Sequence, residues 1–117
     1  LLHDFGDMVR TFCSPEAEDS TNLDKVKVRE HIFASIVEGY VEPLKNVLSE
    51  KEKQSFWLGA KVMSFMIGVR FLTDYLDGDN YFTIHRDNHN LDRARNQFAL
   101  YKDLLKKEQT LKEILFK

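Results

Sequence analysis

The sequence predicts an all-α fold, with three principal helices and a short N-terminal one. Apolar residues recur every four positions in the first half of the chain, and a helix-capping pattern precedes a long apolar segment in the middle. The stretch after residue 90 shows helical spacing again. No segment alternates like a strand, apart from residues 1–5, which resemble the end of one. Because 117 residues is the size of one domain, we expect residues 1–117 to form a single helical domain.

The first part of the chain is expected to hold a short helix, a loop and a long helix. In residues 1–13, Gly6 permits a strand-to-helix corner. The polar run of residues 14–22 is typical of a loop. The long helix is expected from residue 24 to residue 48, with an apolar face that contains Val28, Ile32, Ile36 and Tyr40. Pro43 has no N–H group and should kink or end this helix just before it.

The central helix carries the strongest sequence signals. Ser49 and Glu52 have the spacing of a capping box, in which each side chain accepts the other residue's backbone N–H. Gly78 supplies a C-terminal stop. Between residues 62 and 76 apolar side chains lie all round the helix, so we expect it to be buried in the centre of the fold. It is not expected to cross a membrane, because the run is short and two charged residues interrupt it.

The last part of the chain is expected to be a loop followed by a helix. Residues 77–89 are rich in Gly, Asn and Asp, which indicates irregular structure, while Tyr81, Phe82 and Ile84 should hold this loop against the core. Asn90 is expected to cap the last helix. The buried face of that helix should contain Leu91, Ala94, Phe98, Tyr101 and Leu105, extended by Leu111, Ile114 and Leu115.

Composition limits the classes of function. The chain has 17 basic and 19 acidic residues and a net charge of −2, which does not favour nucleic acid or an anionic membrane as a partner. Cys13 is the one cysteine, so an internal disulfide is excluded and a reducing cytoplasm is the simplest compartment. We expect its thiol to be buried rather than nucleophilic. The chain starts at Leu1 without an initiator methionine or the features of a signal peptide, so we expect a segment of a longer cytoplasmic protein.

Two short patterns have both a functional and a structural interpretation. Asp4-Phe5-Gly6 matches the tripeptide whose Asp binds Mg²⁺ in kinases, but the glycine-rich loop, the lysine and the catalytic loop that such an Asp needs are not in the chain. A structural corner is therefore favoured. His85 and His89 have the spacing of metal ligands on a helix, but they fall in a loop without further ligands. Hydrogen-bonded histidines are favoured there.

Arg70 is the most informative residue, because it lies in the most apolar segment of the chain. A guanidinium buried there is costly unless it is paired, and Asp74, one helical turn later, is the natural partner. One interpretation is a structural ion pair that bridges helices. The other is an arginine that faces a polar ligand cleft, shared with Tyr81 because the turn at Gly78 can fold the chain back beside the helix end.

Longer stretches of the chain resemble a known family. The segments LHDFGDMVRTF, EDSTNL and GAKVMSFMIGVRFLTDYLDGDNYFTIHRDNHNLDRARNQF are similar to the C-terminal part of bacterial N-acetylhexosamine 1-kinases. These enzymes belong to the aminoglycoside phosphotransferase and choline kinase-like superfamily. The resemblance covers nearly the whole chain and is most specific from Gly59 to Phe98. Some relatives carry the name mucin-desulfating sulfatase, although the chain shows no sulfatase feature.

The resemblance implies that this chain is the helical C-terminal subdomain of a kinase-like fold. In the family the ATP-binding lobe, the catalytic loop and the metal-binding Asp precede this part. ATP and Mg²⁺ are therefore implied for the parent protein, and no catalytic, cofactor-binding or metal-binding residue is implied here. The family motifs G-x-R-F-L-T-D-Y and G-D-x-Y-F fall on Arg70 and Tyr81, which are implied to bind the hexosamine, with Asp74 in support. Thr11 departs from the family pattern, because relatives have an aromatic residue near the sugar there.

The implied function is the substrate side of an ATP-dependent sugar kinase that phosphorylates the anomeric hydroxyl of an N-acetylhexosamine, inactive as an isolated chain. The competing class is a non-catalytic helical module that binds a protein through an exposed apolar patch. In the first case the missing N-terminal kinase lobes are the partner, and the surface that faces them should be apolar. We expect Leu1, Leu2, Phe5 and Val9 to contribute to it, and two copies of the chain to associate through it as a homodimer.

Overall fold

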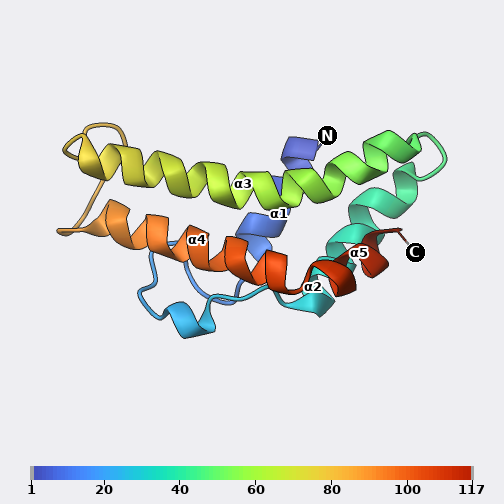
Figure 1. The fold of residues 1–117 in the computed structure, drawn as a ribbon, viewed down its shortest axis with the longest axis horizontal. Helices are drawn as coiled ribbons and strands as arrows, with labels where there is room; N and C mark the ends of the chain where they lie inside the picture. The colour runs from blue at the N-terminus through green and yellow to red at the C-terminus, as the bar shows by residue number, and fades with distance from the viewer. Residues whose placement is uncertain (1, 117) are drawn as a thin grey trace.

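The computed structural model describes residues 2–116, which form an all-helical fold (Figure 1). Helices account for 72% of it, and no strand occurs among the described residues, so the all-α prediction is confirmed. The elements are α1 (Leu2–Phe12), a 3₁₀ turn (Leu23–Lys25), α2 (Glu30–Ile36), a π-helical turn (Val37–Val41), a second 3₁₀ turn (Glu42–Leu44), α3 (Glu50–Leu76), α4 (His89–Lys106) and α5 (Glu108–Phe116).

An antiparallel pair of long helices, α3 and α4, forms the long axis of the molecule (Figure 1). The helix α1 crosses behind α3. At one end of the pair, α2 and α5 pack near the start of α3, and at the other end a loop joins α3 to α4 (Figure 1). The molecule is elongated, with extents of 47 × 25 × 20 Å. The α3–α4 loop is therefore remote from the packing of α2 and α5.

Two glycines set the crossing of α1 and α3. A Cβ atom on Gly6 would lie 2.3 Å from the carbonyl oxygen of Gly59, and a Cβ atom on Gly59 would lie 2.4 Å from the carbonyl oxygen of Leu2. Both distances are well inside van der Waals contact, so only glycine lets these backbones approach so closely. Gly6 lies in the middle of α1, and the expected strand-to-helix corner at this residue is wrong, because the chain is already helical from Leu2.

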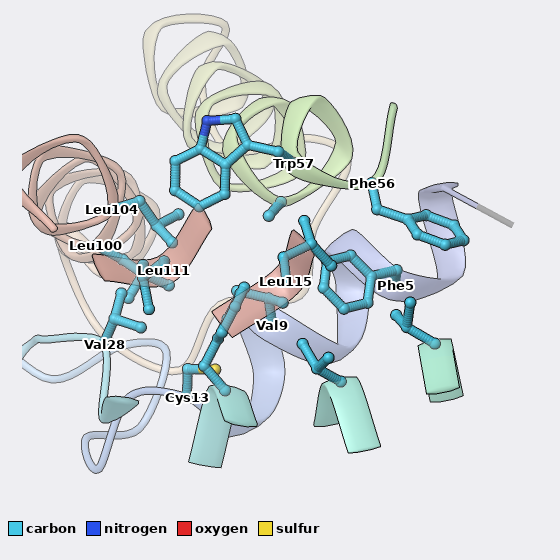
Figure 2. Close-up of a cluster of buried hydrophobic side chains, with 14 of the residues drawn as sticks. Phe5, Val9, Cys13, Val28, Phe56, Trp57, Leu100, Leu104, Leu111 and Leu115 are labelled. Carbon is cyan, nitrogen blue, oxygen red and sulfur yellow. The ribbon is translucent and has the colours of Figure 1, made fainter. Parts of the chain in front are cut away.

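The apolar core lies where α1, α2, α3 and α5 meet the second half of α4 (Figure 2). Aromatic rings fill its centre, and the ring of Phe5 lies 5.3 Å from that of Phe56. Phe5 and Val9 are fully buried, and Leu2 is half-buried. The expectation that this segment forms an exposed apolar surface is therefore wrong, because the chain's own core covers it. Leu1, the remaining member of that expected surface, lies outside the described residues.

The helix expected from residue 24 begins only at Glu30. The residues just before it are extended, because other elements bind their backbone groups. The N–H of Val28 donates to the carboxylate of Asp103 at 2.6 Å, and the ammonium of Lys107 donates to the carbonyl oxygen of Val28 at 2.8 Å. These long-range bonds from α4 and its C-terminal cap satisfy the polar groups that a longer helix would otherwise pair internally.

The expected limits of the central helix are confirmed. Pro43 lies in the 3₁₀ turn that ends the preceding helical segment. Both bonds of the capping box are present: Ser49 Oγ accepts the N–H of Glu52 at 3.1 Å, and the carboxylate of Glu52 accepts the N–H of Ser49 at 3.1 Å. The helix continues to Leu76, and Gly78 follows in a left-handed conformation, with φ of +92°, that glycine adopts without strain.

The expectation that α3 is buried on all sides is wrong. One side packs against α1 and α4, but large apolar side chains remain 38% to 75% exposed elsewhere on the helix: Leu58, Val62, Phe65, Met66, Val69 and Leu76. The reason is that α3 lies along one edge of the molecule (Figure 1). Phe65 lies at the border with α4, because its ring centre is 5.9 Å from that of Phe98 and 5.2 Å from that of Tyr101. Among the described helices α3 is also, by length and composition alone, apolar enough to cross a membrane. The core helix of a soluble protein passes the same test, and the fold is consistent with a soluble protein.

The last helical stretch differs from the expectation in its start and its buried face. The helix α4 begins at His89, with Asn88 as the N-cap residue at φ of 61°, so Asn90 is not the cap but a buried residue of the first turn. Leu105 is exposed and Phe98 is half-buried. The most deeply buried positions beyond the first turn are Ala94, Asn96, Gln97, Leu100 and Leu104. Two of them are polar, so the spacing of apolar residues alone does not identify the buried face of α4.

Candidate functional site

A pocket lies where the α3–α4 loop folds back against the C-terminal end of α3. Its volume is about 360 Å³, within the size range of small-molecule sites. The left-handed turn at Gly78 reverses the chain so that the loop can reach the last turns of the helix. The pocket is lined by Arg70, Thr73, Asp74, Asp77, Tyr81 and Phe82. Arg70, Asp74 and Tyr81, the three site residues expected from the sequence, are thus brought together.

The guanidinium group of Arg70 is exposed and lies against two aromatic rings. Its central carbon is 5.6 Å from the ring centre of Tyr81 and 5.6 Å from that of Phe82. Each such cation–π contact contributes ~0.5–1 kcal/mol at an exposed site. Within residues 2–116, no carboxylate oxygen lies within 4 Å of the Arg70 guanidinium. The rings therefore hold the group in place, while its N–H donors stay available to a ligand.

Asp74 fixes the loop, and the expected ion pair with Arg70 is wrong. Its carboxylate accepts the backbone N–H of Tyr81 at 2.8 Å, the N–H of Phe82 at 3.0 Å and the side-chain amide of Asn90 at 2.7 Å. Burial disfavours the charged form, but these hydrogen bonds outweigh it and hold the pKa of Asp74 below its usual range. Arg70 needs no ion pair because water solvates its exposed side chain.

A polar cluster behind the pocket was missed by sequence reasoning. The side-chain amide of Asn90 donates to Asp74 and also to the carboxylate of Asp79 at 3.1 Å, while its oxygen accepts from Arg93 at 2.9 Å. Arg93 also donates to the carbonyl oxygen of Thr83 at 3.0 Å. The loop is thereby tied to α4 as well as to α3. The signal in the sequence, an asparagine near a helix start, was assigned to capping instead.

The aromatic wall of the pocket consists of tilted and edge-to-face rings, and its outer ring is exposed. The ring of Phe82 lies 4.7 Å from that of Phe71 on α3 and 4.9 Å from that of Tyr81. Phe71 is buried, so this stack anchors the wall to the fold, whereas Tyr81 is 74% exposed. Tyr81 therefore presents a positioned ring face on which a ligand can stack.

The side chain of His89, the first residue of α4, binds the backbone of the loop at His85. The Nδ1 atom of buried His89 accepts the backbone N–H of His85 at 3.1 Å, and its Nε2 atom lies 2.8 Å from the carboxylate of Asp19. Since Nδ1 is an acceptor, the proton of the neutral ring is on Nε2, which donates to Asp19. This bond lowers the pKa of Asp19. Both nitrogen atoms of His89 are thus occupied, and no group of three potential metal ligands occurs in residues 2–116.

The remaining sequence patterns lie outside the pocket. Asp4, Phe5 and Gly6 belong to α1, where Phe5 fills the core and Gly6 contacts the backbone of α3. Cys13 is fully buried, and burial raises the pKa of its thiol to about 12, against an opposing effect of Arg29. A thiol with this pKa is protonated at neutral pH and is not a nucleophile.

No protein-family model matches the chain. The pocket combines a guanidinium with free donors, an exposed phenol ring and a polar rim that includes Thr73 and Asp77. Such a set of groups binds a polar, partly apolar ligand by hydrogen bonds and stacking.

Proposed function

We propose that this chain forms the substrate side of an ATP-dependent sugar kinase, which phosphorylates the anomeric hydroxyl of an N-acetylhexosamine. The observation that carries the proposal is the exposed Arg70 guanidinium, which lies against the rings of Tyr81 and Phe82 in a pocket of small-molecule size and has no carboxylate partner among the described residues. The resemblance of the G-V-R-F-L-T-D-Y and G-D-N-Y-F segments to the motifs of the hexosamine kinases supports the same assignment.

The chemistry of the pocket suits an amino sugar. A guanidinium fork donates to the acetamide oxygen or to ring hydroxyl oxygens, and the face of Tyr81 packs against the apolar C–H face of a pyranose. Asp77 is an exposed carboxylate at the rim that can accept a hydrogen bond from a sugar hydroxyl. In this account the chain contributes position and orientation to the reaction.

ATP and Mg²⁺ do not fit the residues of this pocket. A kinase holds Mg²⁺ with at least one Asp and a further oxygen ligand and cradles the phosphates in a glycine-rich loop. Of the two carboxylates here, Asp74 is occupied by the loop N–H groups, and only Asp77 is free at the rim. No step that involves the nucleotide is assigned to this chain, and nucleotide binding belongs to the rest of the proposed kinase.

A titration followed by ¹H–¹⁵N NMR tests the proposal. With N-acetylglucosamine, we expect the backbone amide signals of Tyr81 and Phe82 to shift in the wild type. The shifts should be lost in Arg70→Ala and retained in Arg95→Ala, a matched control because Arg95 is an exposed arginine of α4 outside the pocket. If none of these signals moves at ~50 mM sugar, a Kd below tens of millimolar is excluded and the proposal fails.

The alternative function, a non-catalytic helical module that binds a protein, is favoured by a different observation. The outer side of α3 exposes large apolar side chains along its length. Exposed apolar patches of this kind mark interaction surfaces. A chain that binds no amino sugar but still associates through α3 would support this alternative over the sugar kinase.

A further inference from the structure

We propose that the exposed apolar side of α3 docks a second copy of this chain, with the two α3 helices antiparallel. The contact surface, here called the α3 seam, consists of Leu58, Val62, Phe65, Met66, Val69 and Leu76. Five of these residues follow steps of four, three, four and seven along the helix, which is the spacing of a helix–helix seam. Such a repeat is self-complementary, because side chains of one helix fit the gaps between those of another.

The exposed area of the α3 seam matches what a dimer needs. Exposed fractions range from 38% for Met66 to 75% for Leu76. With about 150–200 Å² for a full side chain of this size, the seam exposes roughly 500 Å² of apolar surface. A stable interface buries ~800 Å² on each partner, of which ~60% is apolar, or again roughly 500 Å². A monomer rarely leaves a contiguous apolar patch of this size without a use.

The centre of the seam is uncharged, and the sizes of its side chains favour the antiparallel arrangement. No charged residue occurs between Lys61 and Arg70, so the centre of the seam can approach its own copy without repulsion. An antiparallel pair centred near residue 67 places unlike residues of the two helices opposite each other, whereas a parallel pair places each residue opposite its own copy. The antiparallel pairing sets Phe65 opposite the partner's Val69, large against small.

The seam borders the pocket, because Thr73 and Arg70 of the pocket lining lie one turn after Val69 and Met66 of the seam. Neighbouring residues on a helix are ~100° apart around its axis, so Arg70 lies about a quarter turn from Val69 of the seam. Val69 itself does not line the pocket, so its substitution changes none of the lining side chains. The dimer does not depend on the proposed sugar-kinase function, and the two proposals fail in separate experiments.

Sedimentation equilibrium of the 117-residue chain tests the dimer. We expect the wild type to form a concentration-dependent dimer. Val69→Glu should raise the Kd of the dimer at least ~100-fold, because a carboxylate is then buried at the contact. Val47→Glu should leave the Kd unchanged. Val47 is the matched control, since it is 76% exposed before α3 and outside the seam. A wild type that stays monomeric at ~1 mM overturns the proposal. So does an equal weakening of the dimer by Val69→Glu and Val47→Glu, once circular dichroism has confirmed that both variants fold.

Cysteine cross-linking tests the direction of the helices. In the antiparallel pair Leu58 lies opposite the partner's Leu76, so a mixture of Leu58→Cys and Leu76→Cys chains should form disulfide-linked heterodimers on mild oxidation. Neither variant should cross-link efficiently alone, and buried Cys13 does not compete. Efficient homodimeric cross-linking of each variant on its own would show a parallel pair and contradict the proposed arrangement.

Discussion

The substitution Gly6→Ala tests how α1 is held against α3. The added Cβ would lie 2.3 Å from the carbonyl oxygen of Gly59 and 2.6 Å from a side-chain carbon of Met63. The first of these atoms is backbone and cannot rotate away, so α1 has to move outward by about 1 Å. Overpacking of this kind costs ~3 kcal/mol. Alanine returns ~0.8 kcal/mol of helix propensity, so we expect Gly6→Ala to lower the free energy of unfolding by ~2 kcal/mol.

The matched control is Gly39→Ala, because a Cβ at Gly39 meets no atom within 4 Å. Gly39 lies in the helical turn after α2 at a φ that other residues adopt, so alanine should stabilise the protein by ~0.5–1 kcal/mol. Thermal unfolding followed by circular dichroism should then show Gly6→Ala about 8 °C below the wild type and Gly39→Ala a few degrees above it. If both variants are stabilised alike, the backbones of α1 and α3 are not in close contact at Gly6.

Two further predictions concern buried polar groups. Asp74→Asn should raise the hydrogen-exchange rates of the Tyr81 and Phe82 amides at least ~10-fold, because an amide group offers one acceptor oxygen where the carboxylate offers two. The control variant Asp77→Asn, at the rim of the pocket, should leave these rates unchanged. Equal protection of the two amides in both variants would refute this role for Asp74. The pKa of Asp74 is lowered by folding, so its stabilising effect is present at neutral pH and is lost as the pH falls through its folded pKa. Cys13, whose pKa burial raises to about 12, should resist iodoacetamide at pH 8 in the native state and react fully in guanidinium, as followed by mass spectrometry, whereas rapid native labelling would show that the thiol is accessible.

Local signals in the sequence were sufficient where the deciding interactions are themselves local. The capping box at Ser49 and Glu52 and the stop at Gly78 depend on residues within one turn of the helix end, and both limits of α3 were predicted. The start of α2 was not, because Asp103 and Lys107 bind the backbone of Val28 from positions about 75 residues away.

The candidate site was predictable in its members but not in its contacts. The spacing of Arg70, Gly78 and Tyr81 indicated that the loop could return to the helix. The pairing of Arg70 with Asp74 was inferred from the cost of burying a charge. This prediction is wrong because the side chain of Arg70 is exposed. Helix periodicity finds no preferred side in a helix that is apolar all round. Only the packed structure shows which side stays uncovered.

The most direct test of the central claim is a kinetic comparison in a polypeptide that joins this chain to the proposed kinase lobes. Arg70→Ala removes one charge-assisted contact to the sugar, worth ~1.5–3 kcal/mol. We expect KM for N-acetylhexosamine to rise ~10- to 100-fold, while KM for ATP and the melting temperature stay close to those of Arg95→Ala. An equal rise in both KM values, together with a large fall in melting temperature, would contradict the account and leave Arg70 a purely structural residue.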